Sequence, residues 1–257
     1  MAKYRVGAVG YLNTTPLVWG MLHGPQRALV DLQLAIPALC AQQVEDGTTQ
    51  IGLVPVAEVA RQGLEIVPGV GITCLGPVRS ILLFSKVPWK EVRTLAADTS
   101  SRTSVQLARV ILREGFGVEP EITRYAPNLA AMMKEADAAL IIGDPALLID
   151  PHRTPFEWLD LGEEWFKLTR LPMVFAVWAG KQKLPLRELS ELTRASFEFG
   201  KARLTEIIDS EYAKRGISRE LADEYLRRYI RFEVGPPERR GLETFLELAR
   251  LTEGARL

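Results

Sequence analysis

Short apolar runs alternate with helical patterns through the first two thirds of the chain. The runs are strand-sized, are bounded by Gly or Pro, and cover residues 4–9, 32–36, 51–56, 66–73, 80–85, 94–97, 121–125, 138–143 and 173–179. Between them, apolar positions at helical spacing predict helices over residues 16–22, 38–46, 103–114 and 129–136. Strands that alternate with helices predict an α/β fold with a largely parallel sheet, in which ligands bind at the carboxyl ends of the strands.

The last third of the chain has a different pattern. From residue 185 to residue 250, apolar positions recur at helical spacing, and opposite charges recur four residues apart. Ser218 is placed to cap the start of one helix, and Gly235 with the two prolines that follow it predicts a break. The sequence therefore predicts a helical C-terminal segment.

Two segments are candidate hinges. Residues 76–80 lead into the apolar run that ends at Ser85, and residues 171–173 lead into the run that ends at Ala179. If the chain crosses between two α/β lobes at these points, residues 1–80 plus 175–257 form one lobe and residues 81–174 form the other. We expect two lobes joined by two hinge strands, with a small-molecule site in the cleft between them.

Composition and charge argue against several classes of partner. The 257 residues include 32 Lys and Arg against 32 Asp and Glu, so the formal net charge is zero. A nucleic-acid-binding protein would show a basic excess, and a membrane span would need about 18 consecutive apolar residues. The N-terminus lacks the apolar core and the small-residue cleavage site of a secretory signal. We therefore expect a cytoplasmic protein without a nucleic-acid or membrane partner.

The sequence does not predict a metal or nucleotide site. The chain has two cysteines, Cys40 and Cys74, and two histidines, His23 and His152, and none has a partner at metal-ligand spacing. The phosphate-binding fingerprints GxGxxG and GxxxxGKS/T are missing, as is the GxSxG elbow of serine hydrolases. We expect chemistry that uses no metal and no other cofactor.

Three strand-to-helix junctions carry polar residues suited to holding an anion. Hydroxyl, amide and backbone N–H groups at a helix start bind carboxylate or phosphate. The residues concerned are Asn13, Thr14, Ser101, Arg102, Thr103, Ser104, Gly143 and Asp144. Each junction taken alone is most simply a helix cap or a turn. Two such helix starts that faced each other from two lobes would suit a small dicarboxylate held at both ends.

A hydroxyl and three aromatic side chains are further candidates. Ser80 lies in the first hinge, where its hydroxyl either points into the cleft or sits at a strand edge. Phe175, with Trp165 and Trp178, either walls a pocket for an aromatic ring or belongs to the core. The sequence leaves both choices open.

Three arginines are candidates for pairing with a carboxylate. They are Arg79, Arg102 and Arg170, and for each of them a salt bridge within the protein or a solvated position is the simpler role. Alternation along a strand places Arg79 and Ser80 on opposite faces, so we expect only one of these two to face a ligand. Which arginine contacts the ligand stays open.

Five segments, read together, match the motifs of one known family. They are residues 10–17 (GYLNTTPL), 101–104 (SRTS), 140–147 (LIIGDPAL), 160–165 (DLGEEW) and 171–178 (LPMVFAVW). With these motifs the chain resembles the chorismate dehydratases of the futalosine route to menaquinone over residues 4–180. One departure is Arg170, at a position where that family usually has Gly.

The resemblance implies a fold, a reaction and residue roles. The fold is that of the type II periplasmic binding proteins, used here as a cytosolic enzyme. In the reaction, chorismate loses water to give 3-[(1-carboxyvinyl)oxy]benzoate. On matching positions, Asn13 and Ser80 are the active-site residues, and Thr103 and Ser104 bind a carboxylate.

Two alternatives remain. The first is the related 1,4-dihydroxy-6-naphthoate synthase of the same pathway, whose family has Cys-Pro-Asn-Asp where this chain has Leu-Asn-Thr-Thr at residues 12–15. The second is a solute-binding protein that captures a small carboxylate without chemistry. The sequence does not indicate an oligomeric state.

Overall fold

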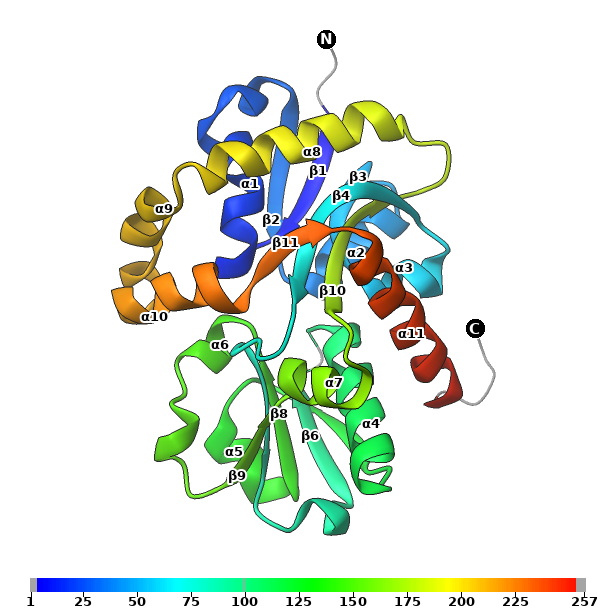
Figure 1. Cartoon of the computed structure of the whole chain (residues 1–257), viewed down its shortest axis with the longest axis vertical. Helices are drawn as coiled ribbons and strands as arrows, with labels where there is room; N and C mark the ends of the chain where they lie inside the picture. Colours follow the sequence, from blue (N-terminus) through cyan, green and yellow to red (C-terminus); the bar gives the residue numbers. More distant parts are fainter. Residues whose placement is uncertain (1–3, 99, 253–257) are drawn as a thin grey trace. The chain divides into compact units, whose positions relative to one another are not determined.

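The computed structural model describes residues 4–98 and 100–252, which form two compact units (Figure 1). The first unit comprises residues 4–73 and 174–239, and the second comprises residues 74–98, 100–173 and 240–252. Residues 74–80 and 240–252, which we expected in the first lobe, are thus part of the second unit.

Close packing explains why these two segments join the second unit. A Cβ atom on Gly162 would lie 2.8 Å from the Cys74 sulfur and 2.7 Å from the Gly76 carbonyl oxygen. At the other end of the chain, the Phe245 ring packs edge-on against the buried Trp165 ring, with centroids 6.1 Å apart. Both segments are therefore bound to the same helix, residues 161–169, through contacts that local sequence patterns do not reveal.

The first unit is built on a six-stranded sheet of order β11-β4-β10-β3-β1-β2. Its strands are β1 (Tyr4–Val9), β2 (Val30–Ala35), β3 (Ile51–Pro55), β4 (Glu65–Cys74), β10 (Met173–Gly180) and β11 (Arg231–Val234). Strand β1 is parallel to β2 and β3, whereas β10 runs antiparallel to β3 and β11 runs antiparallel to β4. The carboxyl ends of β1 and β3 and the amino end of β10 therefore lie at one edge of this sheet.

Helices of the first unit come from both ends of the chain. They are α1 (Thr15–His23), α2 (Pro37–Glu45), α3 (Val56–Gln62), α8 (Leu186–Lys201), α9 (Leu204–Glu211) and α10 (Arg219–Glu224). Shorter helical turns are η1 (Leu12–Thr14), η2 (Pro25–Ala28), η5 (Ala213–Arg215) and η6 (Tyr225–Tyr229). Helix α8 crosses α1, as Figure 1 shows, so the C-terminal segment covers the N-terminal strands.

Small residues let α1 and α8 approach each other closely. A Cβ atom on Gly20 would lie 2.6 Å from the Ser196 Cα atom. The Ser196 hydroxyl donates to the Leu17 carbonyl oxygen at 2.8 Å and accepts from the Met21 backbone N–H at 3.1 Å. Because Ser196 is fully buried, these hydrogen bonds are made away from water and fix the pairing of the two helices.

Gly20→Ala is expected to destabilise the first unit. The added methyl group would overlap the α8 backbone, which cannot move as a flexible side chain would, and overpacking of this kind costs about 1–3 kcal/mol. Chemical denaturation of the variant measures the loss. Gly115→Ala is the control, since a Cβ atom at Gly115 meets nothing within 4 Å. Equal stability of the two variants would contradict this account of the α1–α8 contact.

The second unit has a five-stranded sheet of order β7-β6-β8-β5-β9. Its strands are β5 (Ile81–Ser85), β6 (Thr94–Asp98), β7 (Glu121–Tyr125), β8 (Ala138–Ile142) and β9 (Glu157–Asp160). Strand β6 is parallel to β7 and β8, and β5 is antiparallel to β8 and β9. The carboxyl ends of β6 and β8 and the amino end of β5 therefore lie at one edge.

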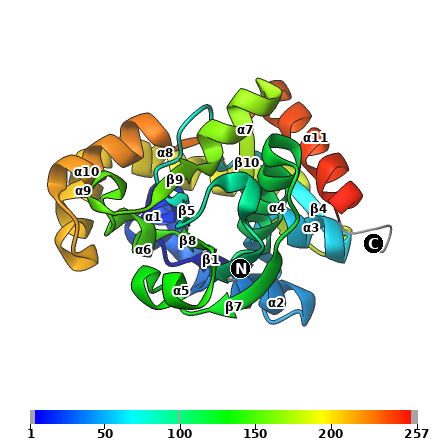
Figure 2. The same ribbon diagram turned by 90° about the horizontal axis from the view of Figure 1, so that it is seen from below.

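Helices cover both faces of this second sheet (Figure 2). The helices of this unit are α4 (Arg102–Phe116), α5 (Leu129–Glu135), α6 (Asp144–Leu147), α7 (Leu161–Thr169) and the larger part of α11 (Pro236–Thr252), with short turns η3 (Trp89–Glu91) and η4 (Pro151–Arg153). Met132 and Met133 of α5 pack with Phe84 and Ile141 in one buried cluster. Helices α4 and α7 pack against each other and against strands of the sheet.

The structure corrects two predictions about the sheets. Both sheets are mixed rather than largely parallel, because β5, β10 and β11 run against a neighbouring strand. Strand β11 lies inside the segment that we predicted to be helical, and β9 was not predicted at all. Only Phe232 of β11 and Asp160 of β9 are buried, so neither segment shows a strand-sized apolar run.

No helix within residues 4–98 and 100–252 is long and apolar enough to cross a membrane.

Candidate active site

The Asn13 loop follows directly after β1 in the first unit. The Gly10 backbone N–H donates to the Ala35 carbonyl oxygen at 3.0 Å, and the chain then turns through η1. Leu12 and Thr14 are buried, whereas Asn13 is only half-buried. The Thr14 hydroxyl lies 3.5 Å from the Asn13 side-chain oxygen and donates to it. The loop therefore buries Leu12 and Thr14 and leaves the Asn13 amide partly exposed. The Thr14 hydroxyl supports that amide through the hydrogen bond to its oxygen.

Phe175 lies at the same edge of the first sheet as Asn13. Its neighbour Ala176 is paired with Pro55, the last residue of β3, and β3 lies between β10 and β1. Phe175 is 7% exposed, whereas Trp165 and Trp178 are fully buried. The two tryptophans are thus core residues, which settles the choice that the sequence left open for them.

The Ser101–Ser104 turn connects β6 to α4 in the second unit. Ser101 caps α4: its hydroxyl oxygen accepts from the Ser104 backbone N–H at 3.4 Å and from the Ser104 hydroxyl at 3.3 Å. Ser101, Thr103 and Ser104 are buried, and Arg102 is exposed. Thr99 of the same junction lies outside the described residues. The prediction that this motif caps a helix is confirmed. The turn also places three hydroxyl groups at one helix start.

An acidic group lies beside this turn. Asp98, the last residue of β6, is 5% exposed and accepts from the Ser100 backbone N–H at 3.0 Å. Burial raises the pKa of the Asp98 carboxyl above its ordinary value, and the Ser100 hydrogen bond opposes that rise. A negative charge here repels an anion at the turn, so protonation of Asp98 would favour anion binding.

Ser80 and Gly143 meet at the same edge of the second sheet. The Gly143 backbone N–H donates to the Ser80 carbonyl oxygen at 2.8 Å, one step beyond the paired residues Ile81 and Ile142. Ser80 is 1% exposed, and Asp144, at the start of α6, is half-buried. Gly143 has φ +65°, a conformation that favours glycine. The second unit thus gathers all its predicted site residues at the edge formed by β5, β6 and β8.

A buried carboxylate outside the predicted site holds the Ser80 segment in place. The Asp160 carboxylate accepts from the backbone N–H groups of Val78 at 2.9 Å and Arg79 at 2.6 Å. It also caps α7 by accepting from Gly162 and Glu163. Burial raises the pKa of the Asp160 carboxyl, and the four backbone donors oppose the rise because they stabilise the carboxylate. The position of Ser80 therefore depends on Asp160.

Arg79 has a structural role rather than the role of a ligand group. Its guanidinium donates to the carbonyl oxygens of Ala146 at 3.0 Å and Ile149 at 2.7 Å. Arg79 lies before β5 with φ +64°, so the strand alternation that we applied to it and to Ser80 does not hold. Its side chain instead ties the Ser80 segment to the end of α6.

Comparison with known proteins identifies the family. A family model described as menaquinone biosynthesis matches residues 4–251. The chain belongs to this menaquinone biosynthesis family. A curated relative, the chorismate dehydratase of Thermus thermophilus, is 30% identical over an alignment 265 residues long. The alignment covers 96% of this chain and 95% of the relative.

Solved structures show the fold of this family member. A protein from Archaeoglobus fulgidus has a TM-score of 0.77 at 17% identity, with 98% of each chain covered. The alkanesulfonate-binding protein SsuA of Xanthomonas axonopodis pv. citri, bound to MOPS, has a TM-score of 0.70 at 13% identity over 100% of this chain and 95% of that one. The predicted periplasmic-binding-protein-like α/β fold is confirmed.

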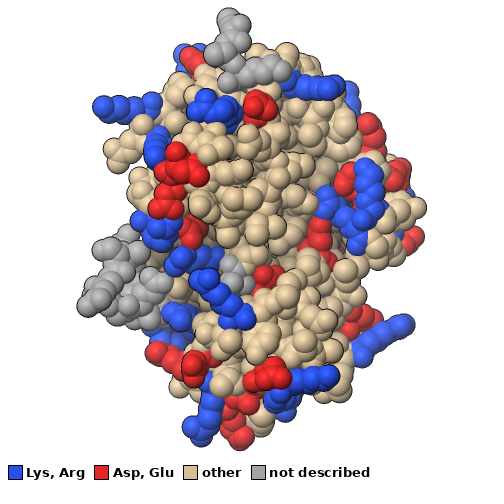
Figure 3. All heavy atoms as spheres, turned by 180° about the vertical axis from the view of Figure 1, so that it is seen from behind, with Lys and Arg blue, Asp and Glu red and all other residues tan. Residues whose placement is uncertain are grey.

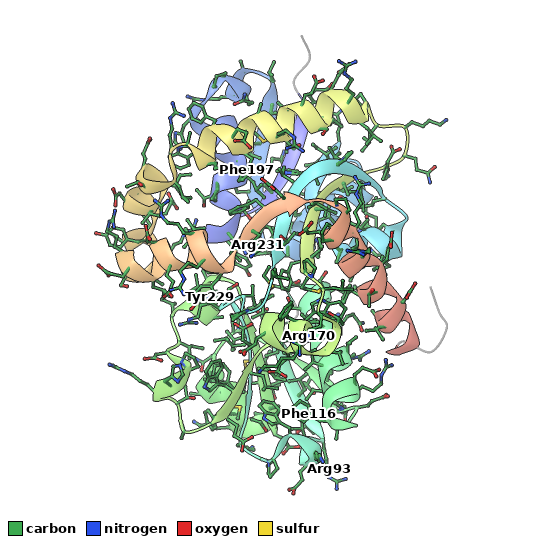
Figure 4. All side chains as sticks on the ribbon, viewed as in Figure 1. Arg93, Phe116, Arg170, Phe197, Tyr229 and Arg231 are labelled. Carbon is green, nitrogen blue, oxygen red and sulfur yellow. The ribbon has the colours of Figure 1, made fainter. Side chains whose placement is uncertain are left out.

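Arg170 holds an unusual backbone conformation in this menaquinone biosynthesis protein. It ends α7 in the left-handed conformation, with φ +62°, which glycine adopts without strain. Its guanidinium lies over the Phe166 ring, 5.6 Å from the centroid. Figure 4 labels Arg170 at the end of α7. A cation over an aromatic face is favourable, and this contact helps to offset the backbone strain.

The described residues contain no group of three or more His, Cys, Asp or Glu side chains placed to hold a metal ion. His23 ends α1 and packs on Trp19, and His152 packs edge-on against Trp158. On the face in Figure 3, Lys and Arg side chains are interspersed with Asp and Glu over the part that the described residues form. The predictions that this protein has no cofactor and no nucleic-acid partner stay predictions.

Cys40 is expected to be unreactive and dispensable for catalysis. The side chain is fully buried, and burial raises the pKa of its thiol to about 12, so it stays protonated near neutral pH. Cys40→Ala should keep kcat within about twofold of the unchanged enzyme. Native protein at pH 8 should also react with a thiol reagent at Cys40 only on unfolding. Rapid labelling of Cys40 in folded protein would contradict the assignment.

A hollow of about 680 Å³ in the first unit contains none of the predicted site residues. It lies between α8, η6, β11 and the start of α11, and its lining includes Phe197, Phe232 and Arg231. Figure 4 labels Phe197 and Arg231 there. The two phenylalanine rings are 5.1 Å apart and give the hollow an apolar wall. We assign the candidate site to the sheet edges instead, because the polar helix starts gather there.

Proposed function

We propose that this protein removes water from chorismate to give 3-[(1-carboxyvinyl)oxy]benzoate, a step in the synthesis of menaquinone. The observation that carries the proposal is the match, over nearly the full length of both chains, to a protein named chorismate dehydratase. The menaquinone biosynthesis family model, which spans residues 4–251, supports the same pathway. The Asn13 loop and the Ser101–Ser104 turn, each taken by itself, suit a carboxylate, and chorismate carries two carboxylates.

The reaction needs stabilisation of charge rather than a metal-held nucleophile. The C–H bond breaks at the ring carbon that bears the enolpyruvyl ether, the C–O bond to hydroxyl breaks at its neighbour, and a ring double bond forms. The proton and the hydroxide leave as water, so atoms balance. This C–H bond is γ to the ring carboxylate through a ring double bond. Negative charge therefore spreads onto that carboxylate as the proton leaves. Fixed hydrogen-bond donors there act more strongly in the transition state than in the ground state.

The proposed roles follow from the resemblance to the chorismate dehydratases. Asn13 and Ser80 are the proposed catalytic residues. Thr103 and Ser104 bind one carboxylate at the start of α4, where a helix N-terminus favours negative charge. Supporting contacts are proposed for Thr14, Ser101, Arg102, Gly143, Asp144 and Phe175.

The base that removes the proton is a separate hypothesis. The amide of Asn13 is neutral and is not a conventional base, so we propose that the side-chain carboxylate of chorismate itself takes the proton. Asn13 and Ser80 then hold the substrate in a near-attack pose, which supplies rate by orientation. A chorismate analogue without that carboxylate should not be turned over. Normal turnover of the analogue would show that the base belongs to the protein.

Incubation of the purified protein with chorismate tests the proposed function directly. Product formation is followed by ultraviolet absorbance, and the product is identified by NMR. The enolpyruvyl benzoate confirms a dehydratase, whereas binding of chorismate without product indicates a solute-binding protein. If chorismate is neither bound nor consumed, the naphthoate synthase of the same pathway becomes the better assignment. A cytoplasmic location stays a prediction.

A further inference from the structure

Arg215 holds both ends of the loop that carries Asn13. It lies in η5, between α9 and α10 of the first unit, and is 205 residues away from Gly10 in the sequence. Its Nη1 atom donates to the Gly10 carbonyl oxygen at 3.0 Å, and its Nη2 atom lies 3.5 Å from the Thr15 hydroxyl oxygen. One planar guanidinium therefore joins the residue before the loop to the residue after it.

Glu211 fixes the guanidinium in this position. The Arg215 Nη2 atom is 3.0 Å from the Glu211 carboxylate, and the two side chains are only 16% and 13% exposed. Lys214 donates to the other Glu211 oxygen at 2.8 Å. Because the pair is shielded from water, it is screened less by salt than a surface pair and holds its geometry better. A lysine cannot replace the planar, forked donor set of Arg215.

The loop gains from such external support. Residues 11–14 pass from extended backbone at Tyr11 (φ −85°, ψ 159°) to helical backbone at Thr14 within one turn. The Thr14 N–H bond to the Tyr11 carbonyl oxygen, 3.0 Å, closes that turn but does not tie it to the rest of the unit. A catalytic amide displaced by about 1 Å loses roughly 100-fold in rate.

We propose that Arg215 is a positioning residue for Asn13. It touches the backbone at Gly10 and the side chain at Thr15, and it acts on the reaction only through the placement of the loop between them. The role in catalysis rests on the proposed function, in which Asn13 acts on chorismate. The role in ordering the loop stands independently of the substrate.

A neighbouring ion pair provides a matched control. Arg219 on α10 pairs with Asp209 on α9 at 2.7 Å, in the same segment of the chain. These two side chains are 44% and 53% exposed, and the contacts of Arg219 lie within its own segment. Removal of Arg219 thus deletes an arginine and an ion pair without touching the Asn13 loop.

The test compares Arg215→Met with Arg219→Met in the full chain. Arg215→Met should lower kcat for chorismate about 10- to 100-fold with a smaller change in KM, because the loop is misplaced while the other substrate contacts remain. Hydrogen exchange of backbone amides 11–14 should accelerate at least about tenfold in Arg215→Met and stay unchanged in Arg219→Met. Added guanidinium ion should restore part of the kcat of an Arg215→Ala variant, which a merely structural role would not produce.

The outcomes separate this proposal from the proposed function. If the unchanged protein does not dehydrate chorismate but Arg215→Met still accelerates exchange at 11–14, the proposed function fails and the positioning role stands. If the unchanged protein is active and Arg215→Met leaves both kcat and loop exchange unaltered, the positioning role fails. Should Arg215→Met not fold, Arg215→Lys is measured in its place, and unaltered kcat and exchange in that variant likewise overturn the proposal.

Discussion

Asn13→Ala is expected to lower kcat for chorismate by about 100- to 1,000-fold, the usual cost of removing one fixed donor from a charge-stabilising site. KM should change far less, because the carboxylate contacts at the start of α4 are untouched. The side chain of Asn13 is only half-buried, so the variant should fold normally. Steady-state kinetics, followed at the absorbance of the aromatic product, measure the effect.

Ser80→Ala is the companion variant and should show a loss of similar kind. Its backbone carbonyl, which accepts from Gly143, is retained, so the variant removes only the hydroxyl. Cys40→Ala serves as the control, since that side chain is fully buried against β3, where its thiol donates a hydrogen bond to the Leu53 carbonyl oxygen, and it is not one of the proposed site residues. An Asn13→Ala enzyme that turned over chorismate like the unchanged protein would refute the assignment of the Asn13 loop.

Asp160→Asn is expected to have the largest effect on stability. The carboxylate accepts hydrogen bonds from four backbone N–H groups. In asparagine an NH2 group replaces one of the two carboxylate oxygens, and this donor would face backbone donors. With Asp160 only 4% exposed, the groups left unpaired have no access to water. We expect a loss of about 2–4 kcal/mol in the second unit, because each unsatisfied buried donor costs about 1–3 kcal/mol. Denaturant unfolding, followed in the second unit by hydrogen exchange, measures it.

Asp150→Asn is the matched control for Asp160→Asn. Asp150 also caps a short helical turn of the second unit, by accepting from the His152 backbone N–H at 3.1 Å, but its side chain is 51% exposed. Asparagine caps helices about as well as aspartate, so this variant should stay within about 0.5 kcal/mol of the unchanged protein. Equal losses at the two positions would mean that the buried backbone donors around Asp160 do not matter.

Local patterns in the sequence predicted most of the strands and little of their arrangement. Strands 4–9 and 121–125 were placed at the observed bounds, because each is an isolated run with a clear end. The direction of β5 and β10 within their sheets depends on where the chain passes from one unit to the other, and no local pattern records that. Strand β11 pairs with β4 across more than 150 residues and has one buried side chain, so it resembled the helices around it.

The candidate site, too, was only partly predictable from local patterns. The Ser101 cap was predictable, because a cap is a relation between residues three positions apart. The support for Ser80 comes from Asp160, 82 residues away from Val78, and the support for Asn13 comes from Arg215. The DLGEEW segment did carry one signal: an Asp that precedes a helix start is a common N-cap. Its second role, toward residues 78–79, required the fold.

The chain order of the first unit has a consequence for synthesis of the protein. Strand β1 and helix α1 emerge from the ribosome first, yet Ser196, which binds the α1 backbone, follows Met21 by 175 residues. The second unit, apart from its last helix, is translated in between as one continuous stretch. The Asn13 loop therefore lacks the Arg215 contacts until η5 has left the exit tunnel, so a nascent chain or a truncated product without this region should be much less active even though the residues proposed as catalytic are all present.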